Sequence, residues 1–165
     1  MKVLIDTNVL LDTIQEREPF CKDSDRVFDL ASEGKIEGCI SVQSLKDIFY
    51  ICRRTYGDDA SFRQIEKLSF LFKVIDISGS DSISALMSNI RDYEDGLLLF
   101  SARRNNIESI ITRNGRDFLE EDMIVIDPKN IDQYVNADVE AGSVIIDNVF
   151  DTTCDDSGRI RSKKI

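Results

Sequence analysis

The sequence predicts a single α/β domain whose central, mostly parallel sheet of about five strands is flanked by helices. Two observations lead to this fold class. Short apolar runs of strand length alternate along the chain with longer stretches whose apolar residues recur at helical spacing. The 165 residues suffice for one domain with one core. We place that domain over residues 1–135 and a partly mobile C-terminal extension of unknown function over 136–165.

Each element follows from its local pattern. Val3 to Ile5 forms a buried strand because branched side chains suit a sheet interior. In the helix predicted over 58–72, Phe62 and Leu68 are expected to face inward. The remaining helices are predicted over 7–15, 23–34 (ending on Gly34 as a C-cap), 42–56, 80–89 and 93–106, and the remaining strands over 37–42, 73–78, 107–112, 123–127 and, in the extension, 144–150.

The composition excludes several classes of function. The chain has no histidine, so catalysis through Ser-His-Asp triads, Cys-His pairs or histidine-bound zinc is excluded. The net charge of -10 by itself argues against a nucleic-acid-binding protein, because contacts to phosphates supply most of the non-specific affinity. Carboxylates that bind divalent cations contribute to that negative count, however, and their site becomes locally positive when the metal is bound. No apolar run has the length of a membrane span and the start does not resemble a signal peptide, so we expect a cytoplasmic protein.

Acidic and polar side chains follow the predicted strands, at the edge where parallel sheets bind ligands. Taken singly, each has a structural alternative as a helix cap or a turn residue. Together, these carboxylates would repel one another by about 4 kcal/mol per close pair at an effective dielectric constant of about 20. A bound cation is the simplest counter-charge, and oxygen ligands favour Mg²⁺ or Mn²⁺. The candidates are Asp6, Asp47, Asp92, Asp95, Thr112, Asn114 and Asp117.

Three blocks of sequence carry a resemblance to a known family. IDTNVLLD stands at the start, SVQSLKDIFYICRR in the middle and RDYEDGLLLFSARRNNIESIITRNGRDF further along. In this order the blocks resemble those of the PIN-domain nucleases, in particular the bacterial group that includes VapC-type toxins. The resemblance extends from Met1 to about Tyr134.

The resemblance implies an endoribonuclease that uses Mg²⁺ or Mn²⁺, with one or two ions, to activate water for in-line attack on an RNA phosphodiester. It also implies a small antitoxin protein as partner, and a homodimer. By matching blocks, the catalytic residues would be Asp6, Asp47, Asp95, Asp117, Thr112 and Asn114, of which Asp6, Asp95 and Asp117 would hold the metal, with Asn8 and Asp92 supporting them. Arg113 and Arg116 flank this proposed site, and we expect them to contact RNA phosphates. Asp92 competes with Asp95 for the third position; we prefer Asp95 because the apolar part of the helix begins directly after it.

Two other functions share part of this sequence pattern. Aspartyl-phosphate phosphatases also place an aspartate after the first strand, but they use Asp-x-Asp, and Asn8 stands where the second acid is needed. A PIN-like fold that binds RNA or protein with little or no catalysis is the stronger alternative, since a fold does not guarantee an activity. Cleavage of RNA by the wild-type chain and by an Asp6→Asn variant discriminates between them.

Overall fold

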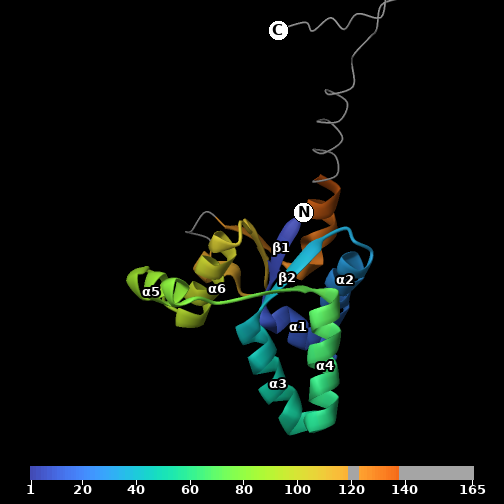
Figure 1. Cartoon of the computed structure of the whole chain (residues 1–165). Coiled ribbons are helices and arrows are strands. Elements are labelled where there is room, and N and C mark those ends of the chain that lie inside the picture. The colour runs from blue at the N-terminus through green and yellow to red at the C-terminus, as the bar shows by residue number, and fades with distance from the viewer. Residues whose placement is uncertain (119–122, 138–165) are drawn as a thin grey trace, which may run out of the picture.

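The computed structural model describes residues 1–118 and 123–137, except for the side chains of residues 116 and 117. Its centre is a parallel sheet of five strands in the order β3-β2-β1-β4-β5. The neighbouring strands β1 and β2 are labelled in Figure 1. The strands are β1 Lys2–Ile5, β2 Glu37–Ser41, β3 Lys73–Ile75, β4 Ser109–Ile111 and β5 Ile124–Ile126. The helices are α1 Thr7–Ile14, α2 Cys21–Ser32, α3 Val42–Tyr56, α4 Asp58–Leu71, α5 Gly79–Met87, α6 Tyr93–Arg104, the 3₁₀ turns η1 Gly115–Phe118 and η2 Pro128–Asn130, and a helix over 131–137.

Two apolar cores cover the two faces of the sheet, as expected when successive side chains of a strand point in opposite directions. Val3 and Ile5 belong to the core that is shared with α1, α2, α3 and α4. Leu4 lies between them and belongs to the core that is shared with α6. In the register of the sheet, Leu4 stands beside Cys39 of β2 on one side and Ile110 of β4 on the other. β1 is therefore the central strand, buried on both faces.

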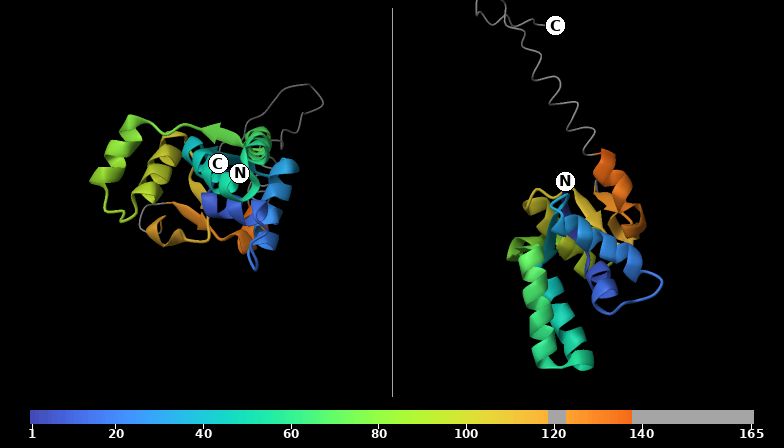
Figure 2. Two further views of the ribbon diagram at one scale, coloured as in Figure 1. Left: turned by 90° about the horizontal axis from the view of Figure 1, so that it is seen from below. Right: turned by 90° about the vertical axis from the view of Figure 1, so that its right-hand side faces the viewer.

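The helix pair α3 and α4 extends well beyond the sheet (Figure 2). Gly57 joins the two helices with a φ of 79°, a conformation that glycine adopts without the strain a Cβ would cause. Their apolar residues are not all buried. The prediction that Phe62 faces inward is wrong, because 63% of Phe62 is exposed, whereas Leu68, at 2%, is buried as expected. Phe62 contacts the ring of Phe49 across the helix pair instead of the core.

The predicted fold class, with all five strands of the sheet, is confirmed. Gly34 ends α2 with a φ of 69°, as the C-cap prediction requires. The helix over 131–137 was not predicted. The strand expected over 144–150, and nearly all of the extension placed at 136–165, lie outside the described residues. Within the described ranges, no helix combines the length and apolar character needed to cross a bilayer.

Candidate functional site

A cavity of about 340 Å³ opens at the carboxyl ends of the central strands. Four acids from three separate segments line it: Asp6, Asp47, Glu94 and Asp95. Asp6 is the N-cap of α1, Asp47 lies on α3, and the other two stand in the first turn of α6. The sheet edge thus brings together side chains that are far apart in the sequence, as expected for a parallel sheet.

Asp6 is the acid that the structure buries most deeply in this cavity, with 8% of the residue exposed. Its backbone N–H donates to the carbonyl of Ile111 at 3.0 Å, which holds the end of β1 against β4. Although Asp6 is the N-cap of α1, its side chain makes no capping hydrogen bond. Its Oδ2 instead accepts a hydrogen bond from the Thr112 hydroxyl at 2.6 Å and another from the amide of Asn8. The side chains of Thr112 and Asn8 therefore hold the carboxylate in place.

The two side chains that hold Asp6, Thr112 in the turn after β4 and Asn8 of α1, also contact each other. The Asn8 amide also donates to the Thr112 hydroxyl oxygen at 3.2 Å, and its oxygen accepts from the backbone N–H of Arg113 at 3.4 Å. The backbone N–H of Asn114 donates to the Thr112 hydroxyl at 3.0 Å, while the Asn114 side chain is exposed. Thr112 and Asn8 thus lie where a supporting role requires, and Asn114 contributes its backbone.

Burial raises the pKa of Asp6 above its usual value. The Thr112 hydroxyl and the backbone amides at the start of α1 oppose the shift without cancelling it. Taking a carboxylate out of water disfavours its charged form unless a positive partner compensates. A divalent cation is such a partner, so Asp6 is an acid whose charged form gains from a cation in the cavity.

The other predicted acids differ in what their side chains contact. Asp47 forms an ion pair with Lys46, with 3.0 Å between Oδ1 and Nζ. The hydrogen bond to Asp47 raises the pKa of Lys46. Asp92 caps α6, because its Oδ1 accepts from the backbone N–H of Glu94 at 2.8 Å and of Asp95 at 3.4 Å. Of the two competing acids, Asp95 lines the cavity and Asp92 starts the helix.

Several cavity residues were missed by sequence reasoning. Ser41 is the N-cap of α3 and accepts from the backbone N–H of Ser44 at 2.9 Å. The Thr7 hydroxyl donates to the Ser44 hydroxyl at 2.9 Å and joins the first turns of α1 and α3. Ser41 is the last residue of β2 and falls inside the strand predicted over 37–42, so that prediction did not mark it as a residue of the strand mouth. Glu94 stands beside Asp95 in the sequence, and no local pattern separates it from the exposed acids at other helix starts.

A buried ion pair joins α1 to the turn after β4. Asp12 of α1 is completely buried, and its Oδ2 lies 2.6 Å from Nε of Arg113. The Nη2 of Arg113 donates to Oδ1 of Asp12 at 3.2 Å, and the guanidinium stacks on the Phe20 ring at 4.0 Å from its centroid. Arg113, predicted to grip RNA phosphate, is thus occupied by a partner within the chain, and its phosphate contact stays a prediction.

The expected convergence of acids on one ion is not found among the described side chains. In that part of the chain, no three acids, cysteines or histidines stand close enough to hold a metal ion together. The side chains of Arg116 and Asp117, which η1 carries, lie outside the described part of the structure. The predicted ligand set of Asp6, Asp95 and Asp117 therefore stays a prediction, with Asp6 and Asp95 placed in one cavity.

The sequence of residues 2–116 matches the family model of the PIN domain. The chain belongs to the PIN-domain family. No curated protein matches the sequence significantly. The match covers β1 to η1 and includes every described residue of the cavity, which establishes the site as part of the PIN domain.

Solved structures of toxin–antitoxin proteins share the fold of this PIN domain. A DNA-bound VapBC from Salmonella typhimurium is 19% identical with a TM-score of 0.59, covering 78% of this chain and 98% of that one. A toxin–antitoxin complex from Klebsiella pneumoniae is 20% identical with a TM-score of 0.57, covering 76% and 97%. VapC20 from Mycobacterium tuberculosis, a toxin that cleaves the sarcin-ricin loop, is 13% identical with a TM-score of 0.58, covering 72% and 95%. At these identities the likeness concerns the fold.

Proposed function

We propose that this PIN domain is a Mg²⁺- or Mn²⁺-dependent endoribonuclease, the toxin of a toxin–antitoxin pair. One observation carries the proposal: Asp6 is buried at the end of the central strand, is held by Thr112 and Asn8, and shares a cavity with Asp47, Glu94 and Asp95. A carboxylate is costly to bury without a positive partner. The similarity to VapC-type toxin structures agrees with a nuclease function.

The donors in the cavity fit a hard divalent cation. The side chains that line it supply carboxylate and hydroxyl oxygens, from the four acids and from Thr7, Ser41 and Ser44. Mg²⁺ binds such oxygens, commonly keeps several waters, and uses one or two carboxylates together with phosphates of its substrate. A site in which Asp6 and Asp95 are the principal ligands, as we propose, therefore does not require three adjoining acids. When bound, the cation supplies an activated water and neutralises charge on the scissile phosphate.

The residues of the chain itself orient the reacting groups. Thr112 and Asn8 hold the Asp6 carboxylate, and the Thr7 to Ser44 hydrogen bond fixes the starts of α1 and α3 relative to one another. Asp47 and Asp95 add negative charge to the same cavity. We place Asp117 beside them as the fourth acid and Arg116 as a phosphate contact, as predicted from the sequence. Without a histidine, proton transfer falls to water and these carboxylates.

Cleavage of a structured RNA in Mg²⁺ or Mn²⁺ tests the proposal. We expect wild-type protein to cleave, EDTA to abolish cleavage, and Asp6→Asn to lower the rate at least about 1,000-fold, because a neutral amide cannot replace the charge. Asp58→Asn is the matched control, since Asp58 is an exposed acid that pairs with Arg53 on the α3–α4 helix pair and does not line the cavity. The control should cleave at the wild-type rate.

The contradicting result is equally definite. Cleavage that survives Asp6→Asn or EDTA overturns the metal-dependent mechanism. If folded wild-type protein binds RNA but cleaves none of a panel of ribosomal, transfer and messenger RNAs, the protein is the binding module instead. The binding function is worth testing because, among the described residues, no three acids stand close enough to hold a metal ion together.

The partner that we propose is a small antitoxin protein that covers the acidic cavity, as the VapBC structures are themselves toxin–antitoxin complexes. We further propose a homodimer in the cytoplasm, where RNA is available. Light scattering on the purified chain tests the dimer. Purification of the chain together with the product of the adjacent gene tests the antitoxin: a 1:1 complex that no longer cleaves RNA supports it, and full cleavage in its presence contradicts it.

A further inference from the structure

Asp12 holds a charge in the interior of the protein. It lies on α1 with 0% of the residue exposed, among core residues of the same helix such as Leu10 and Leu11. A buried carboxylate costs several kcal/mol unless it is paired. Arg113 is the partner, with 28% of its side chain exposed, and Arg17 stands further away at 3.9 Å. The Nε and Oδ2 atoms, 2.6 Å apart, form an ion pair without hydrogen-bond geometry.

The pair is connected to Asp6 through a short series of contacts. Arg113 stands between Thr112 and Asn114 in the turn after β4. Its side chain reaches Asp12, and its backbone N–H donates to Asn8 at 3.4 Å. Thr112, the residue before it, donates to the Asp6 carboxylate at 2.6 Å. Movement of the Arg113 side chain would therefore move the turn that holds Asp6.

We infer that Asp12 is a positioning residue of the candidate nuclease site: through Arg113 it fixes the turn at 112–114, and so the Thr112 hydroxyl on Asp6. Asp12 itself does not line the cavity. It acts through Arg113, in the way that residues hydrogen-bonded to a metal-binding side chain commonly orient that side chain. Phe20, stacked on the guanidinium, covers one side of the pair and keeps Arg113 directed at Asp12. The inference rests on the proposed function for its consequence in catalysis.

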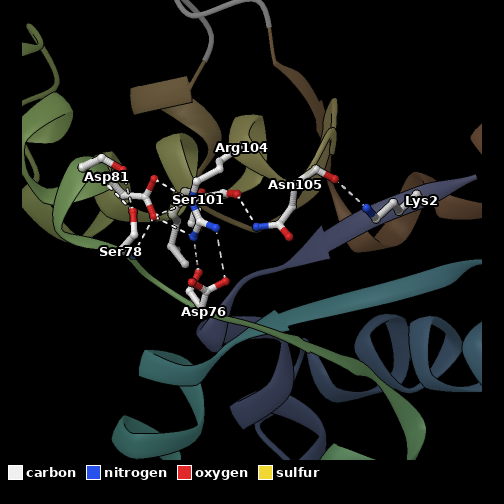
Figure 3. A network of polar contacts seen from close by, with 9 residues as sticks. Lys2, Asp76, Ser78, Asp81, Ser101, Arg104 and Asn105 are labelled. Carbon is white, nitrogen blue, oxygen red and sulfur yellow. Dashed lines mark hydrogen bonds and ion pairs between the residues drawn. The ribbon is translucent and has the colours of Figure 1, made fainter.

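A second buried pair of the same chemistry provides the control. Asp81 at the start of α5 accepts from Arg104 at the end of α6, at 2.9 to 3.1 Å (Figure 3). The exposed fractions, 4% for the Asp81 side chain and 35% for Arg104, resemble those of Asp12 and Arg113. Arg104 is nine residues after Asp95 on α6, about 13 Å along the helix axis. Loss of this pair should cost stability without moving the cavity.

The experiment compares Asp12→Asn with Asp81→Asn in the full-length chain. Asp12→Asn should lower kcat about tenfold, leave KM within about twofold, and weaken binding of Mn²⁺, measured by calorimetry, about tenfold. Asp81→Asn should leave all three within about twofold. The split between kcat and KM separates positioning from phosphate binding, because loss of a phosphate contact would raise KM.

A double-mutant cycle on metal-free protein measures the connection directly. Asp12→Asn combined with Thr112→Val should deviate from additivity by about fivefold in the unfolding equilibrium constant. Asp81→Asn combined with Thr112→Val should be additive within about twofold. Additivity of the first pair, or wild-type kcat and Mn²⁺ affinity in Asp12→Asn, overturns the inference.

A replacement variant covers a folding failure, and a separate outcome distinguishes this inference from the proposed nuclease function. If Asp12→Asn does not fold, Arg113→Lys replaces it, because lysine keeps the charge for Asp12 but loses the two-nitrogen contact; wild-type kcat and additivity with Thr112→Val would then overturn the inference. A folded wild-type chain that cleaves no RNA contradicts the proposed nuclease instead. In that case the cycle still decides whether Asp12 fixes Thr112.

Discussion

The two buried aspartate–arginine pairs have the same chemistry and different positions in the fold. Asp12 and Arg113 join α1 to the turn after β4, the turn whose Thr112 donates to Asp6. Asp81 and Arg104 join the start of α5 to the end of α6, and Arg104 also donates to the carboxylate and the backbone carbonyl of Asp76 (Figure 3). The hydrogen bonds that Arg104 donates to Asp81 and Asp76 raise its pKa.

The difference teaches that a buried ion pair has to be interpreted by what it connects. Desolvation offsets most of the attraction in such pairs, so their presence is weak evidence for stability. The Arg104 pair holds the neighbouring helices α5 and α6 together and also contacts Asp76, which follows β3. Arg113 directly follows Thr112, whose hydroxyl donates to Asp6 at the end of the central strand. Equal losses of stability should therefore accompany unequal losses of activity.

The largest expected effect is on cleavage. Arg113→Met should lower the single-turnover rate of RNA cleavage about 100-fold, because Asp12 loses its partner and the turn at 112–114 loses its anchor. Arg104→Met should change that rate less than about twofold. Equal rates in the two variants would show that the position of the pair is irrelevant to the site. A rise in KM at constant kcat for Arg113→Met would identify it as a phosphate contact.

The next effect is on stability, where the two pairs should behave alike. Asp12→Ala and Asp81→Ala should each lower the free energy of unfolding by about 3 kcal/mol, because each leaves an arginine without its buried partner. Replacing both members, as in Asp81→Leu with Arg104→Met, should return the free energy to within about 1 kcal/mol of wild type. Urea unfolding followed by circular dichroism measures both. A double replacement as costly as the single one contradicts this reading.

A smaller effect concerns pH, with opposite signs at Asp81 and Asp6. Burial raises the pKa of Asp81, but hydrogen bonds from Arg104 and Ser78 outweigh it and leave that pKa below its usual value. Its stabilisation is therefore complete above the unfolded pKa of about 3.9 and is lost as the pH falls through the folded value. Asp6 has a raised pKa, so its ionisation costs stability as the pH rises from about 3.9 through the folded value.

Variants separate these two contributions. Asp81→Asn should flatten the acid limb of a plot of unfolding free energy against pH below about 4. Asp6→Asn should raise the free energy of unfolding at pH 7 by about 1 kcal/mol, since site residues are commonly held at a cost in stability. Thermal unfolding in a series of buffers gives both values. A destabilised Asp6→Asn at pH 7 would mean that its charge is compensated in the folded chain.

The smallest effect is expected at an exposed pair. Arg53 and Asp58 form an ion pair at 2.6 Å, with 52% and 58% of their side chains exposed. Asp58→Asn should change the free energy of unfolding by less than about 0.5 kcal/mol, because water screens such a pair. Chemical unfolding at two salt concentrations measures it. A loss as large as that of Asp81→Ala would show that burial is not what distinguishes the pairs.

Much of the fold was predictable because its signals are local. The alternation of strands and helices and the C-cap at Gly34 follow from neighbouring residues, and the structure agrees. The failure at Phe62 has a physical cause: helical spacing shows which residues share a face, but α4 extends with α3 beyond the sheet, where that face packs on one helix only. The candidate site was predictable at Asp6, because an acid directly after a buried strand needs a polar or positive partner whichever elements pack around it.

By itself, the sequence determined the parallel sheet, the polar residues at its carboxyl edge and the absence of histidine chemistry, since these depend on residue type and short spacing. Only the tertiary structure decided that Asp95 lines the cavity while Asp92 caps its helix. It also decided that Arg113 pairs with Asp12, 101 residues away. The reason is physical: spacing along a helix or strand sets which way a side chain points, but the partner it meets is set by how the elements pack.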